Sequence, residues 1–433
     1  MSKSKLNILF DATVLVDGYM DCHARTGMYF VAENLLDEML RREDIDVVLM
    51  TFPSKSAGLY KIKPQKATIL DDESFLSRIV FSLLYGIKRS RRKVFSLTPL
   101  RKALSLIELI LENGYETYYS KFIFRRYKKW INSNEVVYFS PTTDAPKYLY
   151  HEQKVKKFIV LLDAIPFKLK GYEKQRNNRW ICYFLNKDFY YFAISESTKK
   201  DFCEIYPSIN PEHIQVIYLA AKKAFCPQME EKKNELTKSK YGIPLEKRYV
   251  FSLCTLEPRK NLIRAVKSFI RFAEKNSVGD MIFALGGPAW KDFEKQLEND
   301  ADISGLYSKY VVWIGYVDDD DLPVLYSNAE WFVYTSQYEG FGLPPLEAMQ
   351  CGCPVITSNN SSLPEVVGDA GIMIDWDSDD QHIKAYEEYY FDEQLRRNKC
   401  DKGLKRSKYF SWEKTINEMI TVMNSRMNLK EGV

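Results

Sequence analysis

Short apolar runs alternate with helical patterns along most of the chain, and the alternation occurs in two successive series. Each run ends in polar or small residues, as expected of a buried strand, and apolar residues then recur every three or four positions, as in Gly27–Arg41. This order of elements predicts a parallel, doubly wound sheet. The strands expected in the first series are Leu6–Ala12, Ile45–Phe52, Glu135–Ser140, Lys157–Asp163, Phe192–Ser195 and Ile214–Leu219.

The second series follows residues 220–245, where prolines and a run of charges indicate a linker. Its expected strands are Tyr249–Cys254, Met281–Leu285, Val311–Ile314, Glu330–Thr335, Val355–Thr357 and Ile372–Ile374. A chain of 433 residues also exceeds what one hydrophobic core usually supports. We therefore expect an α/β fold of two facing Rossmann-like domains at 1–222 and 223–410, with a C-terminal helix at 411–433 that packs back toward the first domain.

Residues 75–130 interrupt the first series, because they carry little strand pattern, many aromatic residues and two basic blocks. The blocks are Lys88–Lys93 and Lys121–Trp130, each beside apolar residues at helical spacing. The pattern predicts a helical insertion in the first domain. Two interpretations stay open for its charges: a solvated face on helices that pack normally, or attachment to an anionic membrane surface.

The chain bends at Gly340 and Gly342 after the strand Glu330–Thr335 and then begins a helix with proline in its first turn. The free N–H groups and the positive end of such a helix suit a phosphate or diphosphate. Glu339 precedes this helix and Glu347 lies one turn inside it, so the two carboxylates can point into one pocket.

Two adjacent cations, Arg259 and Lys260, stand at a second helix start, in the stretch Thr255–Leu262. Cations are unfavourable at the positive end of a helix, so this placement indicates an anionic ligand, against the alternative of two solvated side chains. The loop Arg25–Gly27 also begins a helix, and it either meets an anion or is a plain N-cap.

Residues 339–349, together with Gly352–Ile356 and Leu363–Gly368, closely resemble the retaining nucleotide-sugar glycosyltransferases of family 4, which have the GT-B fold. The resemblance covers 135–415 well and 1–70 weakly. It implies metal-independent transfer of a hexose-type sugar from a nucleoside diphosphate, with retention of anomeric configuration, to a glycan, lipid-linked or other acceptor in bacterial surface polysaccharide assembly. It also implies a catalytic set of Glu339, Lys260 and Arg259, and donor-binding residues Glu347, Gly342, Leu343, Phe341, Gly27, Thr255, Tyr316 and Asp163.

Two positions depart from the family pattern. Leu162 stands before Asp163 where relatives often have a histidine that contacts the donor, and Cys254 replaces a glycine near the phosphates. Asp163 is therefore either a donor contact or a structural cap. The departures motivate an alternative, a catalytically silent subunit that binds nucleotide or acceptor and stabilises a partner transferase. A sugar-nucleotide epimerase would need an acid/base set that the sequence does not supply.

Composition and charge narrow the classes of function that remain. A net charge of +4 is too small to imply nucleic acid, and the eight cysteines are scattered without zinc or redox spacing. The acidic run Asp318–Asp321 lies at an expected helix N-terminus, where carboxylates are favoured without a metal. No apolar segment resembles a signal peptide or reaches the ~18 residues of a membrane span. We expect a cytoplasmic enzyme without metal or cofactor, in contact with the inner membrane face if residues 75–130 bind lipid.

Overall fold

The structure is a computed structural model. It describes residues 5–20, 27–52, 55, 58–62, 67–69, 75–93, 98–119, 121, 124–177, 181–255, 257–287, 303 and 305–428. Within these ranges, no helix combines the length and apolar character needed to cross a bilayer. Arg25 and Thr26, and the side chains of all the cations in Lys88–Lys93, lie outside the described residues, so the predictions made for them stay predictions.

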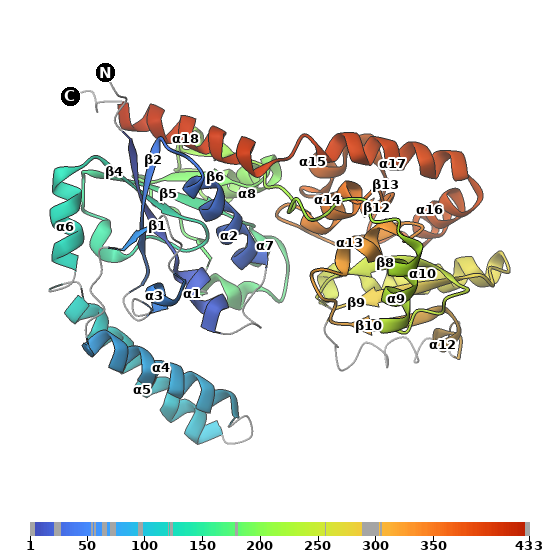
Figure 1. Ribbon diagram of the computed structural model, residues 1–433, viewed down its shortest axis with the longest axis horizontal. Helices are drawn as coiled ribbons and strands as arrows, with labels where there is room; N and C mark the ends of the chain where they lie inside the picture. The colour runs from blue at the N-terminus through green and yellow to red at the C-terminus, as the bar shows by residue number, and fades with distance from the viewer. Residues whose placement is uncertain are drawn as a thin grey trace.

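The first half of the chain forms a parallel seven-stranded sheet in the order β3-β2-β1-β4-β5-β6-β7 (Figure 1). Phe10 of β1 lies opposite Leu49 of β2 on one side and Phe139 of β4 on the other. The strands are β1 Leu6–Asp11, β2 Ile45–Met50, β3 Thr68–Ile69, β4 Val136–Ser140, β5 Val155–Leu161, β6 Tyr190–Ala193 and β7 Ile214–Val216. Asp163 therefore lies just beyond β5 rather than inside it, at the carboxyl edge of the sheet.

Helices cover both faces of this sheet. The helices of the first half are α1 Thr13–Met20, α2 Gly27–Leu40, α3 Leu59–Ile62, α4 Phe75–Lys93, α5 Thr98–Tyr118, α6 Phe124–Ser133, α7 Ile165–Lys168 and α8 Glu196–Ile205, with 3-10 turns η4 Lys147–Leu149, η5 Glu173–Asn177 and η6 Pro211–His213. The apolar pattern did not predict α1, which is short and mostly buried, nor the two-residue strand β3.

The second half forms a parallel six-stranded sheet in the order β10-β9-β8-β11-β12-β13. Its strands are β8 Arg248–Leu253, β9 Met281–Gly286, β10 Val311–Gly315, β11 Phe332–Tyr334, β12 Val355–Ser358 and β13 Gly371–Ile374. Its helices are α9 Glu231–Lys240, α10 Leu262–Lys275, α12 Tyr307–Tyr310, α13 Leu322–Ser327, α14 Leu343–Gln350, α15 Leu363–Val367, α16 Asp379–Phe391 and α17 Glu393–Ser407, with η7 Pro258–Lys260 and η8 Gly368–Ala370. Two Rossmann-like parallel sheets were predicted, and both are confirmed. The expected linker is shorter than predicted, because α9 lies within it and packs against α13.

Helices α4 and α5 pair as a hairpin that extends away from the first sheet (Figure 1). The hairpin leaves large apolar side chains in solvent, among them Leu106, Leu109 and Ile110, which are 58%, 52% and 62% exposed. In contrast, α6 packs on the sheet: Ile131 is fully buried, and the Tyr127 hydroxyl donates to the carbonyl of Leu49. Helix α6 therefore packs on the sheet, whereas the α4–α5 hairpin extends away from it.

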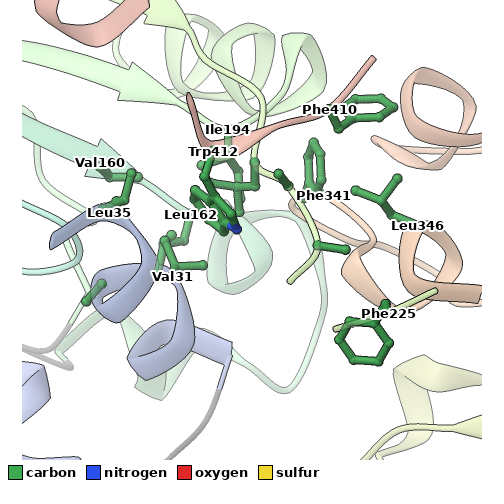
Figure 2. Close-up of a cluster of buried hydrophobic side chains, with 14 of the residues drawn as sticks. Val31, Leu35, Val160, Leu162, Ile194, Phe225, Phe341, Leu346, Phe410 and Trp412 are labelled. Carbon is green, nitrogen blue, oxygen red and sulfur yellow. The ribbon is translucent and has the colours of Figure 1, made fainter. Parts of the chain in front are cut away.

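One apolar cluster runs through both halves of the molecule (Figure 2). Val31 of α2 and Leu162, just beyond β5, belong to it, as do Phe341 and Leu346 from the other half. The last helix, α18 Trp412–Asn428, contributes Trp412 and crosses back to pack against α2 and β5. The two sheets therefore share buried apolar surface. The proposed domain boundaries at 222/223 and 410/411 stay a proposal.

Candidate active site

Residues 335–342 connect β11 to α14, and we call them the Glu339 loop. Gly342 ends the loop in the left-handed region, with φ of 115°, and serves as the N-cap of α14. A Cβ on Gly342 would also lie 2.8 Å from the Leu363 side chain, so both conformation and space favour glycine. Pro344 and Pro345 occupy the first turn of α14, where an N–H has no intrahelical partner. The helix therefore begins where the sequence predicted, within one residue.

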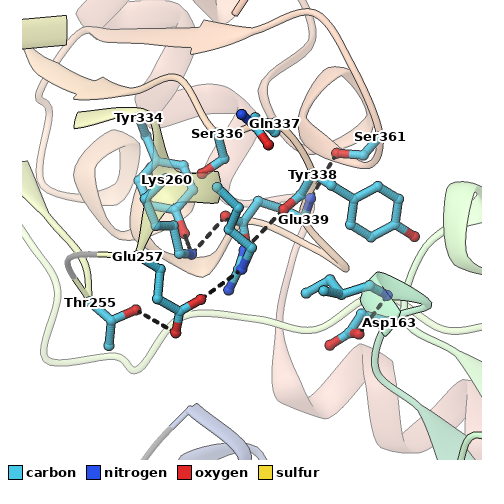
Figure 3. A network of polar contacts seen from close by, with 12 residues as sticks. Asp163, Thr255, Glu257, Lys260, Tyr334, Ser336, Gln337, Tyr338, Glu339 and Ser361 are labelled. Carbon is cyan, nitrogen blue, oxygen red and sulfur yellow. Dashed lines mark hydrogen bonds and ion pairs between the residues drawn. The ribbon is translucent and has the colours of Figure 1, made fainter. Parts of the chain in front are cut away.

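The three residues predicted to be catalytic meet at this loop, and Figure 3 labels two of them, Glu339 and Lys260. Lys260 Nζ lies 2.6 Å from Glu339 Oε1 and 2.5 Å from the Tyr334 hydroxyl. Arg259 Nη1 lies 3.0 Å from the same carboxylate oxygen and donates to the carbonyl of Tyr338, also at 3.0 Å. Glu339 and Lys260 are both buried, at 8% exposed. The turn η7 thus holds both cations against the carboxylate of the Glu339 loop.

The cations set the charge state of this cluster. Burial alone would raise the pKa of Glu339, but the charges of Lys260 and Arg259 outweigh it and lower that pKa to about 2. Burial would lower the pKa of Arg259, and the charge of Glu339 raises it instead. Burial, and then the charge of Glu339, raises the pKa of Tyr334, which therefore stays protonated. The Glu339 carboxylate thus stays ionised between the two basic side chains, and Arg259 also pairs with the more exposed Glu257.

Cys254, which follows β8, is packed closely against Gly287, which follows β9. Burial raises the pKa of Cys254 to about 12, so its thiol is neutral. A Cβ on Gly287, which has φ of 128°, would lie 2.0 Å from the carbonyl oxygen of Cys254. Thr255 lies at the entrance of η7, where its hydroxyl is 3.4 Å from Glu257, and Glu257 in turn pairs with Arg259 at 3.1 Å.

Glu347 lies on α14, where its Oε2 accepts a hydrogen bond of 3.2 Å from the Tyr326 hydroxyl. Burial raises the pKa of Glu347 to about 7, and the Tyr326 bond and the Lys222 charge only reduce this effect. Tyr316 follows β10 and is 75% exposed, so its ring is available to a planar ligand.

The acidic run 318–321 is engaged by lysines. Lys240 Nζ lies 2.6 Å from Asp318 and 2.5 Å from Asp321, which precedes α13, and Lys222 lies 3.7 Å from Asp319. Across the described residues, no group of three or more His, Cys, Asp or Glu side chains is arranged to hold a metal ion. Asp318 and Asp321 thus connect α9 to the residues before α13 through Lys240.

The first half of the molecule reaches the Glu339 loop at the end of β5. A Cβ on Gly340 would lie 1.9 Å from the carbonyl oxygen of Leu162 and 3.0 Å from Cβ of Asp163, so the two backbones are in direct contact. Asp163 Oδ1 accepts from the N–H of Ile165 at 3.0 Å, and burial raises the pKa of Asp163. Asp163 thus bonds the first N–H of α7, and it also lies beside the loop in Figure 3.

Three other predicted donor-binding residues have different surroundings. The Phe341 ring is buried in the shared apolar cluster, beside Phe410 with ring centroids 5.9 Å apart, so the ring itself is not open to a ligand. Leu343 is partly buried against the same cluster and begins α14. Gly27 begins α2 and is exposed, and a Cβ added there would meet no heavy atom within 4 Å. Leu162 points into the apolar cluster, as Figure 2 shows.

Several polar residues around the loop had no sequence signal. The Tyr338 hydroxyl donates to Asp201, and Glu365 accepts from the backbone of Glu196, although these pairs lie 137 and 169 positions apart. Tyr334 was expected only as part of a strand. Pairs so distant in sequence leave no periodic pattern that could predict them.

Two facing parallel-sheet halves, with a cation–carboxylate cluster beside the helix start at their junction, define a GT-B-type protein. A glycosyltransferase of Rickettsia africae ESF-5 has the same fold, with a TM-score of 0.65, 13% identity and coverage of 99% of this chain and 100% of that one. Anabaena HepE in complex with UDP and glucose superposes with a TM-score of 0.62, 14% identity and coverage of 97% and 100%. Residues 233–406 match the family described as Glycosyl transferases group 1.

Sequence relatives match about half of the chain or less. The O-antigen chain mannosyltransferase B of Escherichia coli is 37% identical over 174 residues, which are 40% of this chain and 44% of that protein. The serotype-specific mannosyltransferase WbdA of Escherichia coli is 33% identical over 229 residues, 52% of this chain and 27% of that protein. The match thus spans less than half the length of these relatives.

Proposed function

We propose that the protein is a retaining glycosyltransferase that moves a hexose-type sugar, mannose first among candidates, from a nucleoside diphosphate to a glycan or lipid-linked acceptor. The observation that carries the proposal is the buried contact of Glu339 with Lys260 and Arg259 beside the start of α14. The names of the mannosyltransferase relatives support mannose, and the O-antigen in the name of the first supports surface polysaccharide assembly.

The proposed reaction needs positive charge where the donor's diphosphate departs. The bond from the anomeric carbon to the β-phosphate oxygen breaks, and the acceptor oxygen attacks the same face while its proton passes to the departing phosphate. Arg259, Lys260 and the N–H groups at the start of α14 stabilise the developing negative charge, so no metal is required. Glu339 orients the cations and meets the sugar hydroxyls, and Glu347 accepts from the ribose hydroxyls.

The test is a transfer assay with nucleoside-diphosphate mannose and with glucose and N-acetylglucosamine donors, using mannose-terminated glycans as acceptors. We expect transfer of mannose with the axial anomeric configuration, read from the product by NMR, and equal rates with EDTA and with Mg²⁺. An inverted product, or activity abolished by EDTA and restored by Mg²⁺, would contradict the proposal. Binding of a nucleotide sugar without transfer or slow hydrolysis would favour the silent-subunit alternative.

We further propose that the α4–α5 hairpin brings the enzyme to an anionic membrane surface, where a lipid-linked acceptor would be found. The exposed apolar positions Leu106, Ile107, Leu109 and Ile110 of α5 support this, because a solvated hairpin gains nothing from exposing them. The sequence of α4 adds Lys88–Lys93, whose five cations would contribute about 5 kcal/mol toward an anionic surface at low salt, at about 1 kcal/mol each.

Liposome flotation tests this part. Wild type should float with anionic vesicles and release as salt rises. A variant with Lys88, Arg89, Arg91, Arg92 and Lys93 changed to glutamine should not float, nor should one with Leu106, Ile107, Leu109 and Ile110 changed to serine. A control with two exposed apolar residues of the other half changed, Leu236→Ser and Phe391→Ser, should float like wild type. Equal flotation of all four proteins would exclude the hairpin as the membrane contact.

A further inference from the structure

One helix of the first half, α8, holds the Glu339 loop of the second half. The carbonyl oxygen of Gly340 accepts hydrogen bonds from the hydroxyls of Ser195 and Thr198, at 2.8 and 3.3 Å. The Tyr338 hydroxyl donates to Asp201 Oδ2 at 2.5 Å. Ser195, Thr198 and Asp201 are spaced by three residues, so they share one face of α8. Two residues that flank Glu339 in sequence are therefore bonded to a single helix of the other half.

This face of α8 is itself fixed at both ends. Asp201 is 5% exposed, and its other oxygen lies 2.5 Å from Lys168 Nζ on α7. At the start of α8, the carboxylate of Glu365 on α15 accepts from the N–H groups of Glu196 and Ser197, both at 2.7 Å. A carboxylate is favoured at this end of a helix by the exposed N–H groups and the helix dipole. Helix α8 thus has little freedom to follow the loop if the loop moves.

Tyr338 is the neighbour of Glu339, so its hydroxyl bond limits where the Glu339 carboxylate can lie. Tyr338 is 6% exposed, and burial together with Asp201 raises its pKa, so the hydroxyl keeps the proton that it donates. Without this bond, the loop retains the contacts of Arg259 with Glu339 and with the carbonyl of Tyr338, which lie in the same half. The bonds from Ser195 and Thr198 to Gly340 also remain, so the link across the two halves would be weakened at Tyr338.

We infer that Tyr338 and Asp201 are positioning residues, which couple the placement of the two halves to the orientation of Glu339 between Lys260 and Arg259. The pair touches no reacting atom and acts through Glu339. The inference rests on the proposed function only for its kinetic consequence, because the movement of the loop can be measured without turnover.

Amide hydrogen exchange of residues 336–342 tests the coupling directly. Tyr338→Phe removes one hydroxyl and no ring, and should speed exchange in the loop at least tenfold. The matched control is Tyr310→Phe, which removes a hydroxyl that donates to Glu274 at 2.5 Å within the second half. This control should leave exchange in the loop unchanged. Unaltered exchange in Tyr338→Phe, or equal acceleration in both variants, would overturn the inference.

Kinetics then show whether the loop orientation matters to the reaction. Tyr338→Phe should lower kcat at least tenfold while the Kd of the free nucleoside diphosphate stays within twofold, because the proposed nucleotide contacts do not involve Tyr338. Asp201→Asn keeps an acceptor for Tyr338 and should lose less activity, and the double variant should be no slower than the Tyr338→Phe protein. The inference would be overturned if Tyr338→Phe raised the Kd of the free nucleoside diphosphate by the same factor as it lowered kcat. If wild type itself transfers no sugar, the proposed function fails, and the exchange result still decides the coupling.

Discussion

Replacing Lys260 by methionine would remove the ammonium group nearest to Glu339 and leave the carboxylate buried. The difference between the ordinary pKa of 4.5 and the value of about 2 corresponds to roughly 3 kcal/mol in favour of the charged form, at about 1.36 kcal/mol per pH unit. Breaking a buried ion pair from one side typically costs about 3–5 kcal/mol. Arg259 remains 3.0 Å from the carboxylate, so we expect the lower end, a loss of about 3 kcal/mol in the free energy of unfolding.

Chemical denaturation at several pH values would measure this loss. In wild type, the stabilisation from the lowered pKa of Glu339 is fully present above pH 4.5 and is lost as pH falls toward 2. In Lys260→Met, the charge of Lys260 no longer offsets the burial of Glu339, so the pKa of Glu339 rises. Protonation of Glu339 then removes the cost of burying its charge. The difference in unfolding free energy between the two proteins should therefore narrow as pH falls from 7 toward 4.

A double variant supplies the control. Lys260→Met combined with Glu339→Gln removes both charges, so its stability should come within about 1 kcal/mol of Glu339→Gln alone. The reasoning would be refuted if the double variant were as unstable as the sum of the two single ones. The reasoning would also be refuted if the difference in unfolding free energy between Lys260→Met and wild type stayed constant from pH 8 to pH 4.

Three other substitutions test separate parts of the molecule. Gly340→Ala should lower the free energy of unfolding by about 1–3 kcal/mol and reduce kcat, because the new methyl would lie 1.9 Å from a backbone oxygen at the end of β5. In the control Gly279→Ala, the new methyl meets no atom within 4 Å, so neither the free energy of unfolding nor kcat should change. Calorimetry measures the first quantity and transfer assays the second. Wild type should bind a nucleoside diphosphate about tenfold more weakly at pH 6 than at pH 8 in titration calorimetry, if only the ionised Glu347 accepts from the ribose, and Glu347→Gln should flatten this dependence. Asp11→Asn should lower the free energy of unfolding by about 1–3 kcal/mol in denaturant titrations, because the buried carboxylate accepts from three hydroxyl groups and the amide would turn a donor toward some of them.

The two sheets were predictable because parallel strands covered on both faces leave continuous apolar runs in the sequence. Phe332, for example, is fully buried between Phe251 of β8 and Val355 of β12. Helix α1 was missed because Thr13–Met20 is apolar nearly all round and too short to show a period. Strand β3 has only two residues, which are too few to show a sequence pattern. It is recognised only through its pairing with β2.

The cluster of Glu339, Lys260 and Arg259 was predictable because each residue sits in a local motif with a turn and a helix start. The motifs did not reveal that the three would contact one another before any ligand binds, since that depends on how η7 packs against the loop. The contacts from α8 were beyond reach, because Asp201 and Tyr338 meet only through the placement of the two halves.

Helix α18 has a practical consequence for recombining this protein with its relatives. Family similarity ends at residue 406, yet the helix that follows packs on α2 and β5, with Ile416, Met419 and Met423 buried to 4% or less. The Thr415 hydroxyl also donates to the carbonyl of Tyr218 at 2.7 Å. A chimaera that takes its second half from one of the relatives should therefore return to this sequence before Trp412. A crossover placed after α18 would import a helix shaped against a foreign partner, and such a hybrid should express poorly even when its imported half folds.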